Sequence, residues 1–446
     1  MTTLVFVGSH LGYPMEKTPL GGGAMVGLQL ARAWAKERDL DLRLLGSGSV
    51  APAPGYVRLP EGAGEEKLVS LSELAYARFC RRFENATTEW ILNRRNGLDP
   101  KRAVVVVNDV SEGPTLSRLH DAGFPIVSLW HVDVVDYFNR MYLKHIVAPE
   151  RLTKLYERLR TLGPGKMMPD VLKLVFEKQR ETVRCSSRMI FPSRMMAETI
   201  NRCYGPEDFQ NRGAVVPWGV WPTTADMKIA AAEAEGLRAH YQITPKTTVL
   251  MTLSRISPEK GIHLLLEALR LLEAKGSANE DLCLFICGEA AFMQGASYMR
   301  QVRKAAARLK KVRVFFPGYL ADQQKQAYYR LAHLFVSPSV HDSYGLNIVE
   351  AMQAGLPILA SDHYGVQDIL KESFGRKVRY ESLKQAPAGL AAALEKLVGD
   401  RVGLAGMGEH ARRAAAASPF ERAAATVLSQ SLSLIKESRA AAAVSR

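Results

Sequence analysis

The sequence is poor in the features that mark membrane-spanning, disulfide-stapled or zinc-binding proteins. No uninterrupted apolar run reaches the roughly 18 residues of a membrane-spanning helix, so no such helix is expected. The first residues lack a basic segment and pass directly into an apolar strand, so we expect no signal peptide and a cytoplasmic location. Only five cysteines occur, without the spacing of zinc ligands, and Cys283 and Cys287 lie in one apolar run. Reduced thiols in a core are therefore expected instead of disulfides or a metal site.

No motif of a nucleic-acid-binding protein accompanies the positive charge of the chain. Lys and Arg number 59 against 45 Asp and Glu, which gives a formal net charge of +14. Such a balance attracts nucleic acid, anionic membranes or phosphorylated substrates. A zinc finger, a helix-turn-helix and the aromatic motifs of RNA-binding domains are all missing, so we expect no nucleic-acid partner. The 446 residues, 47% of them hydrophobic, suffice for two or three domains with their own cores.

The stretch at 334–367 carries the most information about function. Its apolar run at 334–336 stops at a Ser-Pro pair, as a buried strand does before a loop. A helix is then expected over 346–354, because a glycine and, shortly after it, a proline follow as stop signals. A second short apolar strand is expected at 357–360. The order is therefore strand, loop, helix and strand.

Two carboxylates bracket the expected start of this helix. Asp342 lies in the loop before the helix and Glu350 about one turn inside it, so both can face one cleft at the edge of a sheet. Between them the backbone N–H groups near Gly345, Leu346 and Asn347 are the unpaired donors of a helix N-terminus, which favour an anion and above all a phosphate. Each acid alone has a simpler interpretation, as a helix cap or as part of a solvated helix face. Together they form hydroxyl acceptors on either side of a phosphate cradle, which suits a nucleotide sugar.

The stretch from Asp342 to Ala351 resembles the paired-acid motif of retaining GT-B glycosyltransferases of the large family four type (group 1), related to starch, glycogen and sucrose synthases. That family usually has Glu-Gly-Phe-Gly-Leu where this chain has a shorter acid, Asp342, followed by Ser343; the departure leaves the sugar specificity open. The resemblance implies an α/β fold of GT-B type, with two doubly wound Rossmann-like domains facing each other across a deep cleft. The donor is then expected mainly on the C-terminal half and the acceptor mainly on the N-terminal half.

A second motif of the family lies after the strand expected at 248–253. Arg255 and Lys260, with Gly261 behind them, match the family's Arg…Lys-Gly phosphate motif residue by residue. A guanidinium and an ammonium on one loop are good partners for a diphosphate, although two exposed surface cations would explain the loop alone. The resemblance assigns both residues to the leaving diphosphate.

The other donor candidates rest on the same resemblance. Residues 317–320 resemble the family loop whose backbone reads the nucleobase. The glycine-rich stretch at 21–23 has the wrong spacing for a dinucleotide-binding fingerprint, but it resembles the family loop whose amides approach the donor diphosphate and the acceptor. The donor-binding candidates are thus Gly22, Gly23, Gly318, Tyr319, Leu320, Tyr344, Gly345, Leu346, Asn347 and Glu350.

The N-terminal half is expected to supply a residue that faces the sugar. Strands are expected at 103–108 and 125–129, and ligands gather at the carboxyl ends of parallel strands. A lone histidine is more often structural than functional, but His131 follows the second strand, where the family places a histidine facing the donor sugar. Asn108 and Asp109 follow the first strand and are weaker acceptor-side candidates. The catalytic candidates are His131, Arg255, Lys260 and Asp342.

No metal ligands are expected. Asp39 and Asp41 form a DxD pattern, but a turn from a helix to a strand explains it more simply, so we reject a metal site there. Because cations and backbone amides can neutralise the diphosphate, the resemblance implies transfer without a bound metal or another cofactor.

A basic insertion at about 138–183 interrupts the α/β pattern. Ten Lys and Arg residues are interleaved with Leu, Met and Phe, which predicts two or three amphipathic helices around a break at Gly163-Pro164-Gly165. Three interpretations remain open: a solvated helical insertion, a lid for an anionic acceptor, and a surface that docks on anionic lipid. The lack of a tryptophan-rich apolar face argues against strong membrane insertion.

The linker between the halves is expected at 215–220, which resembles the family's hinge strand with Trp218 and Trp221 in place of Asn and Asp. We expect an N-terminal acceptor-side domain over 1–221, a donor-binding domain over 222–417, and a C-terminal helix and tail over 418–446 that crosses back to the first domain. The alanine-rich tail after Ser438 is expected to be disordered.

The function that the resemblance implies is retaining transfer of a hexosyl group from a nucleotide diphospho-sugar, with UDP as the first expectation, to an acceptor hydroxyl. Glu350 would hold the ribose hydroxyls and Asp342 a hydroxyl of the sugar. The acceptor is expected to be anionic or lipid-linked, with peripheral contact to the inner membrane face through the basic insertion. The alternatives are a polymer-extending synthase or a nucleotide-sugar epimerase on the same fold, and a non-catalytic phosphate- or nucleic-acid-binding protein. The identities of the base, the sugar and the acceptor, and the oligomeric state, stay open.

Overall fold

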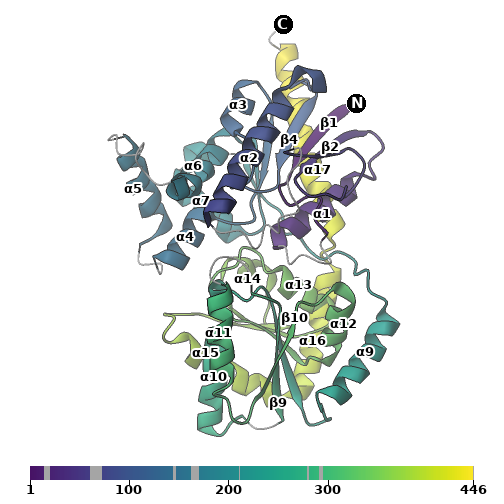
Figure 1. Ribbon diagram of the computed structural model, residues 1–446, viewed down its shortest axis with the longest axis vertical. Helices are drawn as coiled ribbons and strands as arrows, with labels where there is room; N and C mark the ends of the chain where they lie inside the picture. Colours follow the sequence, from purple (N-terminus) through teal and green to yellow (C-terminus); the bar gives the residue numbers. More distant parts are fainter. Residues whose placement is uncertain are drawn as a thin grey trace. The chain divides into compact units, whose positions relative to one another are not determined.

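The computed structural model describes residues 1–14, 21–60, 73–143, 147–161, 170–209, 211–278, 281–290 and 295–444. The chain forms two compact units (Figure 1). Unit 1 comprises Met1–Trp218 together with Glu421–Arg446, and unit 2 comprises Gly219–Phe420. Each unit is built on one parallel sheet with helices packed around it, so the predicted α/β fold class is confirmed.

The sheet of unit 1 has the strand order β3-β2-β1-β4-β5-β6-β7, and every neighbouring pair is parallel. Its strands are β1 Thr2–Val7, β2 Leu40–Gly46, β3 Tyr56–Arg58, β4 Ala103–Val107, β5 Ile126–Leu129, β6 Arg188–Phe191 and β7 Gly213–Val215. The chain builds outward from β1 in one direction and then from β4 in the other. In such a sheet the loops after these two central strands diverge and leave a crevice for ligands.

The helices of unit 1 are α1 Gly22–Trp34, α2 Glu73–Leu92, α3 Leu116–Asp121, α4 Val134–Tyr142, α5 Pro149–Thr161, α6 Asp170–Cys185, α7 Arg194–Tyr204, α8 Pro206–Phe209 and α17 Phe420–Val444. Helix α17 is anchored in this unit because the indole N–H of Trp34 donates to the backbone oxygen of Ala424 at 3.0 Å. The prediction of a disordered tail after Ser438 was wrong, because the helix continues to Val444. Alanine has the highest helix propensity of all residues, so a run of it extends a helix that packing has already started.

The basic insertion folds as α4, α5 and α6. Helices α5 and α6 pack through the rings of Tyr156 and Phe176, which are stacked with their centroids 4.6 Å apart. Asp136 and Arg140 form an ion pair one turn apart on α4 at 2.8 Å. The predicted break at 163–165 lies outside the described residues.

The sheet of unit 2 has the order β10-β9-β8-β11-β12-β13, again with every pair parallel. Its strands are β8 Thr248–Leu253, β9 Leu282–Cys287, β10 Arg313–Gly318, β11 Leu334–Ser337, β12 Ile358–Ser361 and β13 Gly375–Val378. Its helices are α9 Met227–His240, α10 Ile262–Lys275, α11 Gly295–Ala306, α12 Asp322–Leu331, α13 Leu346–Gln353, α14 Tyr364–Ile369, α15 Ala386–Val398 and α16 Arg401–Ala416, with the short 3-10 turn η4 at Pro258–Lys260. The reversal of strand order lies between β8 and β11.

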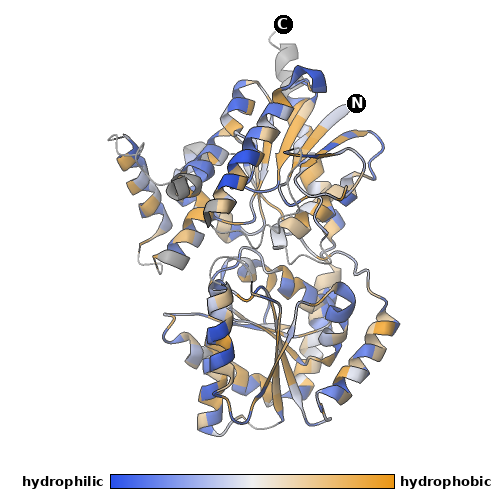
Figure 2. Cartoon of the chain, viewed as in Figure 1, coloured by the Kyte–Doolittle hydropathy of each residue, from blue (hydrophilic) through white to orange (hydrophobic). Residues whose placement is uncertain are grey.

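Both faces of the central strands β8, β9, β11 and β12 are buried, which explains why these strands read as largely apolar runs. On one face Leu250 and Leu284 pack with α10, α11 and α15, and on the other Val249 and Phe285 pack with α9, α12, α13 and α16. These central strands are accordingly mostly hydrophobic, whereas the helices carry hydrophilic outer faces (Figure 2). All five cysteines are free thiols, as expected. Burial raises the pKa of Cys283 to about 11, so its thiol stays protonated. No helix in the described ranges is long and apolar enough to cross a membrane.

Candidate active site

Two loops meet at the strand reversal of unit 2. Strands β8 and β11 are neighbours, with Leu250 opposite Leu334, so the segments after their carboxyl ends emerge side by side. The backbone N–H of Val340 donates to the backbone oxygen of Glu259 at 2.7 Å. Gly261 has a φ of 63°, and a Cβ there would lie 2.1 Å from the oxygen of Pro338, so only glycine allows this approach. The topology therefore brings together the two loops on which the sequence motifs lie.

Asp342 and Lys260 form an ion pair between these loops. The ammonium nitrogen of Lys260 lies 2.7 Å from Oδ2 of Asp342, and their side chains are only 13% and 17% exposed. Burial alone would raise the pKa of Asp342, but the charge of Lys260 and the hydrogen bond that it donates hold this pKa well below its ordinary value. Asp342 is therefore charged at neutral pH and fixed in place by its partner.

His363 is a neighbour of this pair that the sequence reasoning missed. Its Nδ1 lies 3.1 Å from the backbone oxygen of Asp342. Burial lowers the pKa of His363 to about 4, so the ring is neutral at physiological pH. Its Nε2 is buried and has no hydrogen-bond partner within the described part of the chain. The available signal was its position two residues after the end of β12, the strand beside β11.

The N-terminus of α13 lies between Asp342 and Glu350. Gly345 is its N-cap with a φ of 86°, a left-handed conformation that suits glycine, and it offers no side chain to cap the helix. Two of the donor-binding candidates near Gly345 form side-chain hydrogen bonds within unit 2. The hydroxyl of Tyr344 accepts the N–H of Gly219 at 2.9 Å, and the side-chain amide of Asn347 donates to the oxygen of Leu253 at the same distance. Their side chains thus fix the helix tip, and the backbone N–H groups of Leu346 and Asn347 lie at the free end of α13.

Glu350 is held by two side chains of α12 that the sequence did not single out. Lys325 Nζ lies 2.9 Å from Oε1 of Glu350, and the hydroxyl of Tyr329 lies 3.4 Å from Oε2. Lys325 also lies 3.6 Å from Asp322. Burial would lower the pKa of Lys325, but these carboxylates raise it, so the ammonium stays charged.

Arg255 and Lys260 lie on the same loop but have different partners in the structure. Arg255 Nη2 lies 3.7 Å from Oε1 of the buried Glu259, and its own side chain is 28% exposed. The loop of Gly318, Tyr319 and Leu320 is joined to this region through β9. The N–H of Gly288 donates to the oxygen of Gly318 at 2.7 Å, and a Cβ on Gly288 would lie 1.9 Å from the oxygen of Ser254.

In unit 1 the structure brings His131, Asn108 and Gly23 together. Asn108 donates through Nδ2 to the oxygen of Gly23 at 3.0 Å, and its Oδ1 lies 3.2 Å from Nε2 of His131. A Cβ on Gly23 would lie 2.9 Å from the ring of His131, which in turn lies 5.4 Å from the ring of Trp218. Burial lowers the pKa of His131 to about 4, so a neutral imidazole is presented here. Gly22 and Gly23 lie in the first turn of α1 and not in the loop before it.

A second polar cluster of unit 1 was missed by the sequence reasoning. Ser9 and His10 follow β1, and Glu112 lies in the loop after the neighbouring β4. His10 Nδ1 lies 3.1 Å from Glu112 and 2.8 Å from the hydroxyl of Ser9, which also donates to Glu112. Burial would raise the pKa of Glu112, but His10 and Ser9 lower it, so this buried acid stays charged. The sequence signal for this cluster was again its position, because its residues follow the carboxyl ends of the two central strands.

Asp41 of the DxD pattern is hydrogen-bonded to two side chains. Asp41 accepts two hydrogen bonds from Arg43, at 2.9 and 3.0 Å, and one from Thr3 at 3.0 Å. Over the described ranges, no group of three or more His, Cys, Asp and Glu side chains is placed to hold a metal ion.

Solved structures share the fold of this chain. Sucrose-phosphate synthase from Thermosynechococcus elongatus covers 98% of this chain and all of its own, with a TM-score of 0.72 at 16% identity. Anabaena HepE, solved in complex with UDP-glucose, covers 96% of this chain and 100% of its own, with a TM-score of 0.62 at 16% identity. The fold is that of the GT-B glycosyltransferases, as the sequence motifs predicted.

A family comparison matches part of the chain. Residues 234–415 match the family described as glycosyl transferases group 1. A curated relative, lipopolysaccharide 1,2-N-acetylglucosaminetransferase of Salmonella typhimurium, is 28% identical over 230 residues. That match covers 50% of this chain and 56% of the relative, which is less than two thirds of the relative's length.

Proposed function

We propose that the protein transfers a glycosyl group from a nucleotide diphospho-sugar to an acceptor hydroxyl, with retention at the anomeric carbon. The observation that carries this proposal is the buried pair of Asp342 and Lys260 beside the N-terminus of α13. A buried carboxylate kept charged next to a lysine and a row of backbone N–H groups suits a ligand that has both hydroxyls and phosphates. UDP is the first candidate for the carrier, because HepE was solved with UDP-glucose.

In this proposal each group has a separate task. Lys260, Arg255 and the N–H groups at the tip of α13 stabilise the negative charge that builds on the departing diphosphate, which is the largest electrostatic contribution expected in such a transfer. Asp342 accepts a hydrogen bond from a hydroxyl of the sugar, and Glu350 accepts those of the ribose. The acceptor oxygen attacks the anomeric carbon on the face from which the diphosphate leaves, and the leaving phosphate takes the proton of the acceptor. No covalent nucleophile or bound metal is invoked, because the cations and amides supply the charge neutralisation.

His131 is assigned to a sugar hydroxyl. A neutral imidazole can donate through one nitrogen and accept through the other, and it suits a neutral hydroxyl better than a phosphate. Gly23 leaves the space in which this ring lies, and Asn108 fixes the orientation of the ring.

The proposal is tested by the turnover of Lys260→Ala. We expect a loss of at least about a hundredfold, as for other lost donors to a developing anion. Lys275→Ala is the matched control, because Lys275 pairs with Glu395 on the surface of the same unit. Near-normal turnover of Lys260→Ala would contradict the assignment to the diphosphate.

Further assays decide which kind of reaction the protein catalyses. Sugar transfer is measured with UDP-, GDP-, ADP- and TDP-sugars after a screen for thermal stabilisation by the four nucleoside diphosphates, since a ligand that binds the folded state raises its melting temperature. A growing polymer would indicate a chain-extending synthase, and conversion of the donor alone would indicate an epimerase. Salt-dependent binding to random duplex DNA that Glu350→Ala leaves unchanged would indicate a non-catalytic protein.

For the acceptor we propose an anionic or lipid-linked molecule reached at the inner membrane face. Helix α5 supports this, because Arg151, Lys154 and Arg158 lie on one exposed face together with Leu155, which is 54% exposed. Basic residues around an apolar one suit a surface of anionic lipid. Co-sedimentation with phosphatidylglycerol vesicles, but not with phosphatidylcholine vesicles, is expected, and reversal of the three charges to Glu should abolish it. Equal binding of the variant would overturn this part of the proposal.

A further inference from the structure

The carboxylate of Glu350 is contacted on both of its oxygens from one face of α12. Lys325 and Tyr329 lie one helical turn apart and point at Oε1 and Oε2, at 2.9 and 3.4 Å. The side chains of Lys325 and Glu350 are 16% and 20% exposed, and Tyr329 is fully buried. Burial raises the pKa of Tyr329 well above its ordinary value, so its hydroxyl stays protonated and donates to Glu350.

Lys325 is itself fixed by a second acid. Asp322 lies 3.6 Å from its ammonium and accepts three further hydrogen bonds through Oδ2. Two come from the hydroxyls of Thr223 and Thr224, at 2.8 and 3.0 Å, and one comes from the backbone N–H of Thr224 at 2.9 Å. The ammonium is thus held between two carboxylates, one of which is tied to the segment that opens unit 2.

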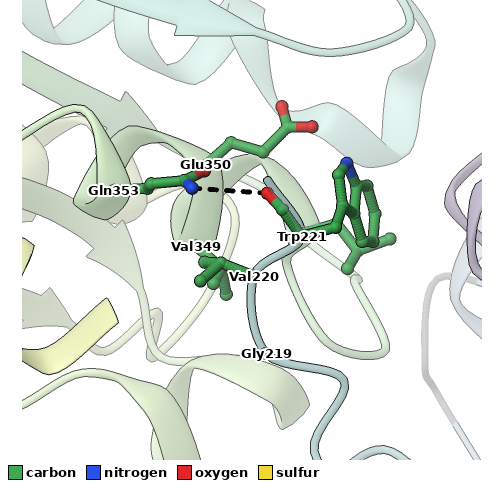
Figure 3. A pocket seen from close by; sticks show the side chains of 7 residues that line it. Gly219, Val220, Trp221, Val349, Glu350 and Gln353 are labelled. Carbon is green, nitrogen blue, oxygen red and sulfur yellow. Dashed lines mark hydrogen bonds between the residues drawn. The ribbon is translucent and has the colours of Figure 1, made fainter. Parts of the chain in front are cut away.

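The same segment is also tied to α13. Gln353, one turn after Glu350, donates through Nε2 to the backbone oxygen of Trp221 at 3.3 Å (Figure 3). A small pocket lies between residues 219–221 and α13, and Glu350 is part of its lining. Segment 221–224, α12 and α13 therefore form one hydrogen-bonded frame around the Glu350 side chain.

A carboxylate has about four lone-pair positions on its two oxygens. Lys325 and Tyr329 occupy one on each oxygen, and within the described part of the chain this leaves one on each for a ligand. Two acceptor positions side by side on a charged, oriented carboxylate match the geometry of a vicinal diol. A buried salt bridge alone gives little net stability, so its geometry is better explained by orientation than by energy.

We propose that Lys325, together with Tyr329, is a positioning residue that orients Glu350 to accept both hydroxyls of the ribose diol, and thereby lets the protein distinguish a ribonucleotide from its deoxy counterpart. The inference rests on the proposed function, because it assumes that a nucleoside diphosphate binds at Glu350. In this inference Lys325 and Tyr329 contact no substrate themselves, and yet they set the preference for the ribose form of the nucleotide.

The experiment compares the affinities for UDP and for 2′,3′-dideoxy-UDP, with the ADP and GDP pairs run alongside, by calorimetry on the full chain. The wild type is expected to prefer the ribose form by about tenfold or more, the size of a hydrogen bond to a charged group. Glu350→Gln should remove most of this preference, so that the ratio of the two affinities approaches one. Lys325→Met, which keeps the length of the side chain, should lower the ratio towards one while the affinity for the dideoxy form changes little.

Two further variants separate orientation from a structural role. Lys325→Arg should restore a large part of the ratio, and Tyr329→Phe should lower it by a smaller factor than Lys325→Met. Tyr329→Phe also keeps the test valid if Lys325→Met folds poorly. Lys275→Met, on the exposed pair with Glu395, is the matched control and should leave the ratio unchanged.

The outcomes distinguish failure of the inference from failure of the proposed function. If none of the diphosphates binds to the wild type, the proposed function fails. If the wild type prefers ribose and Glu350→Gln removes this preference, but Lys325→Met and Tyr329→Phe keep it, then only the inference is overturned. A ratio that survives in Glu350→Gln overturns the assignment of the diol to Glu350, and the inference with it.

Discussion

Replacing Lys260 by Met tests the ion pair on which the candidate site depends. The change removes an ammonium 2.7 Å from Asp342 while keeping the aliphatic stem. Removing one partner of a buried pair costs about 3–5 kcal/mol, because the other charge is left without compensation. For a domain of this size that corresponds to a fall of about 6–20 °C in the melting temperature of unit 2.

The dependence of this loss on pH is the sharper part of the prediction. In the wild type the folded-state pKa of Asp342 lies below its ordinary value of 3.8, so the stabilisation is fully present above that value and is lost as the pH falls through the folded pKa. In Lys260→Met burial acts with little opposition and raises the pKa of Asp342 above its ordinary value. The deficit of the variant should therefore be largest at pH 7–8 and should shrink as the pH approaches 4.

The assay is thermal and urea unfolding of both proteins between pH 4 and pH 8, followed on the transition of unit 2. Lys275→Met is the control, because the exposed pair of Lys275 and Glu395 should contribute no more than about 1 kcal/mol. A deficit of Lys260→Met that is the same at pH 4.5 and pH 8, or no larger than that of the control, would refute the reasoning.

Three further predictions concern unit 1 and a surface helix. Gly23→Ala should lower turnover by about 10–100-fold by displacing the ring of His131, whereas Gly236→Ala, in open space on α9, should stabilise the fold by up to about 1 kcal/mol in urea titrations. The wild type should lose stability as the pH falls from about 6.5 to about 4, because the unfolded chain binds a proton that buried His131 does not; His131→Gln should flatten this part of the profile, and an unchanged slope would contradict it. Trp34→Phe should destabilise unit 1 by at least about 0.5–1.5 kcal/mol, because the hydrogen bond from the indole N–H to the backbone oxygen of Ala424 is lost, and an unchanged unfolding midpoint would show that α17 needs no such anchor.

The sequence alone determined the fold class and the local elements around the paired-acid motif. Apolar runs, the second of which stops at a Ser-Pro pair, indicated the strands now seen as β8 and β11, and the helix predicted over 346–354 is found at Leu346–Gln353. These signals are local, since a buried strand must be apolar on both faces and a helix ends where glycine and proline follow. The alanine-rich tail was misread because its composition is compatible both with a disordered tail and with a helix, and packing at Trp34 and Ala424 starts the helix.

The tertiary structure alone decided which side chains hold one another. Lys260 and Asp342 are 82 positions apart, and they pair because the strand order reverses between β8 and β11. Lys325 and Tyr329 carry no motif, and they reach Glu350 because the packing of α12 and α13 on one face of the sheet sets which sides of these helices face each other. Such contacts depend on the direction of whole elements in three dimensions, and a spacing along the chain contains no information about that direction.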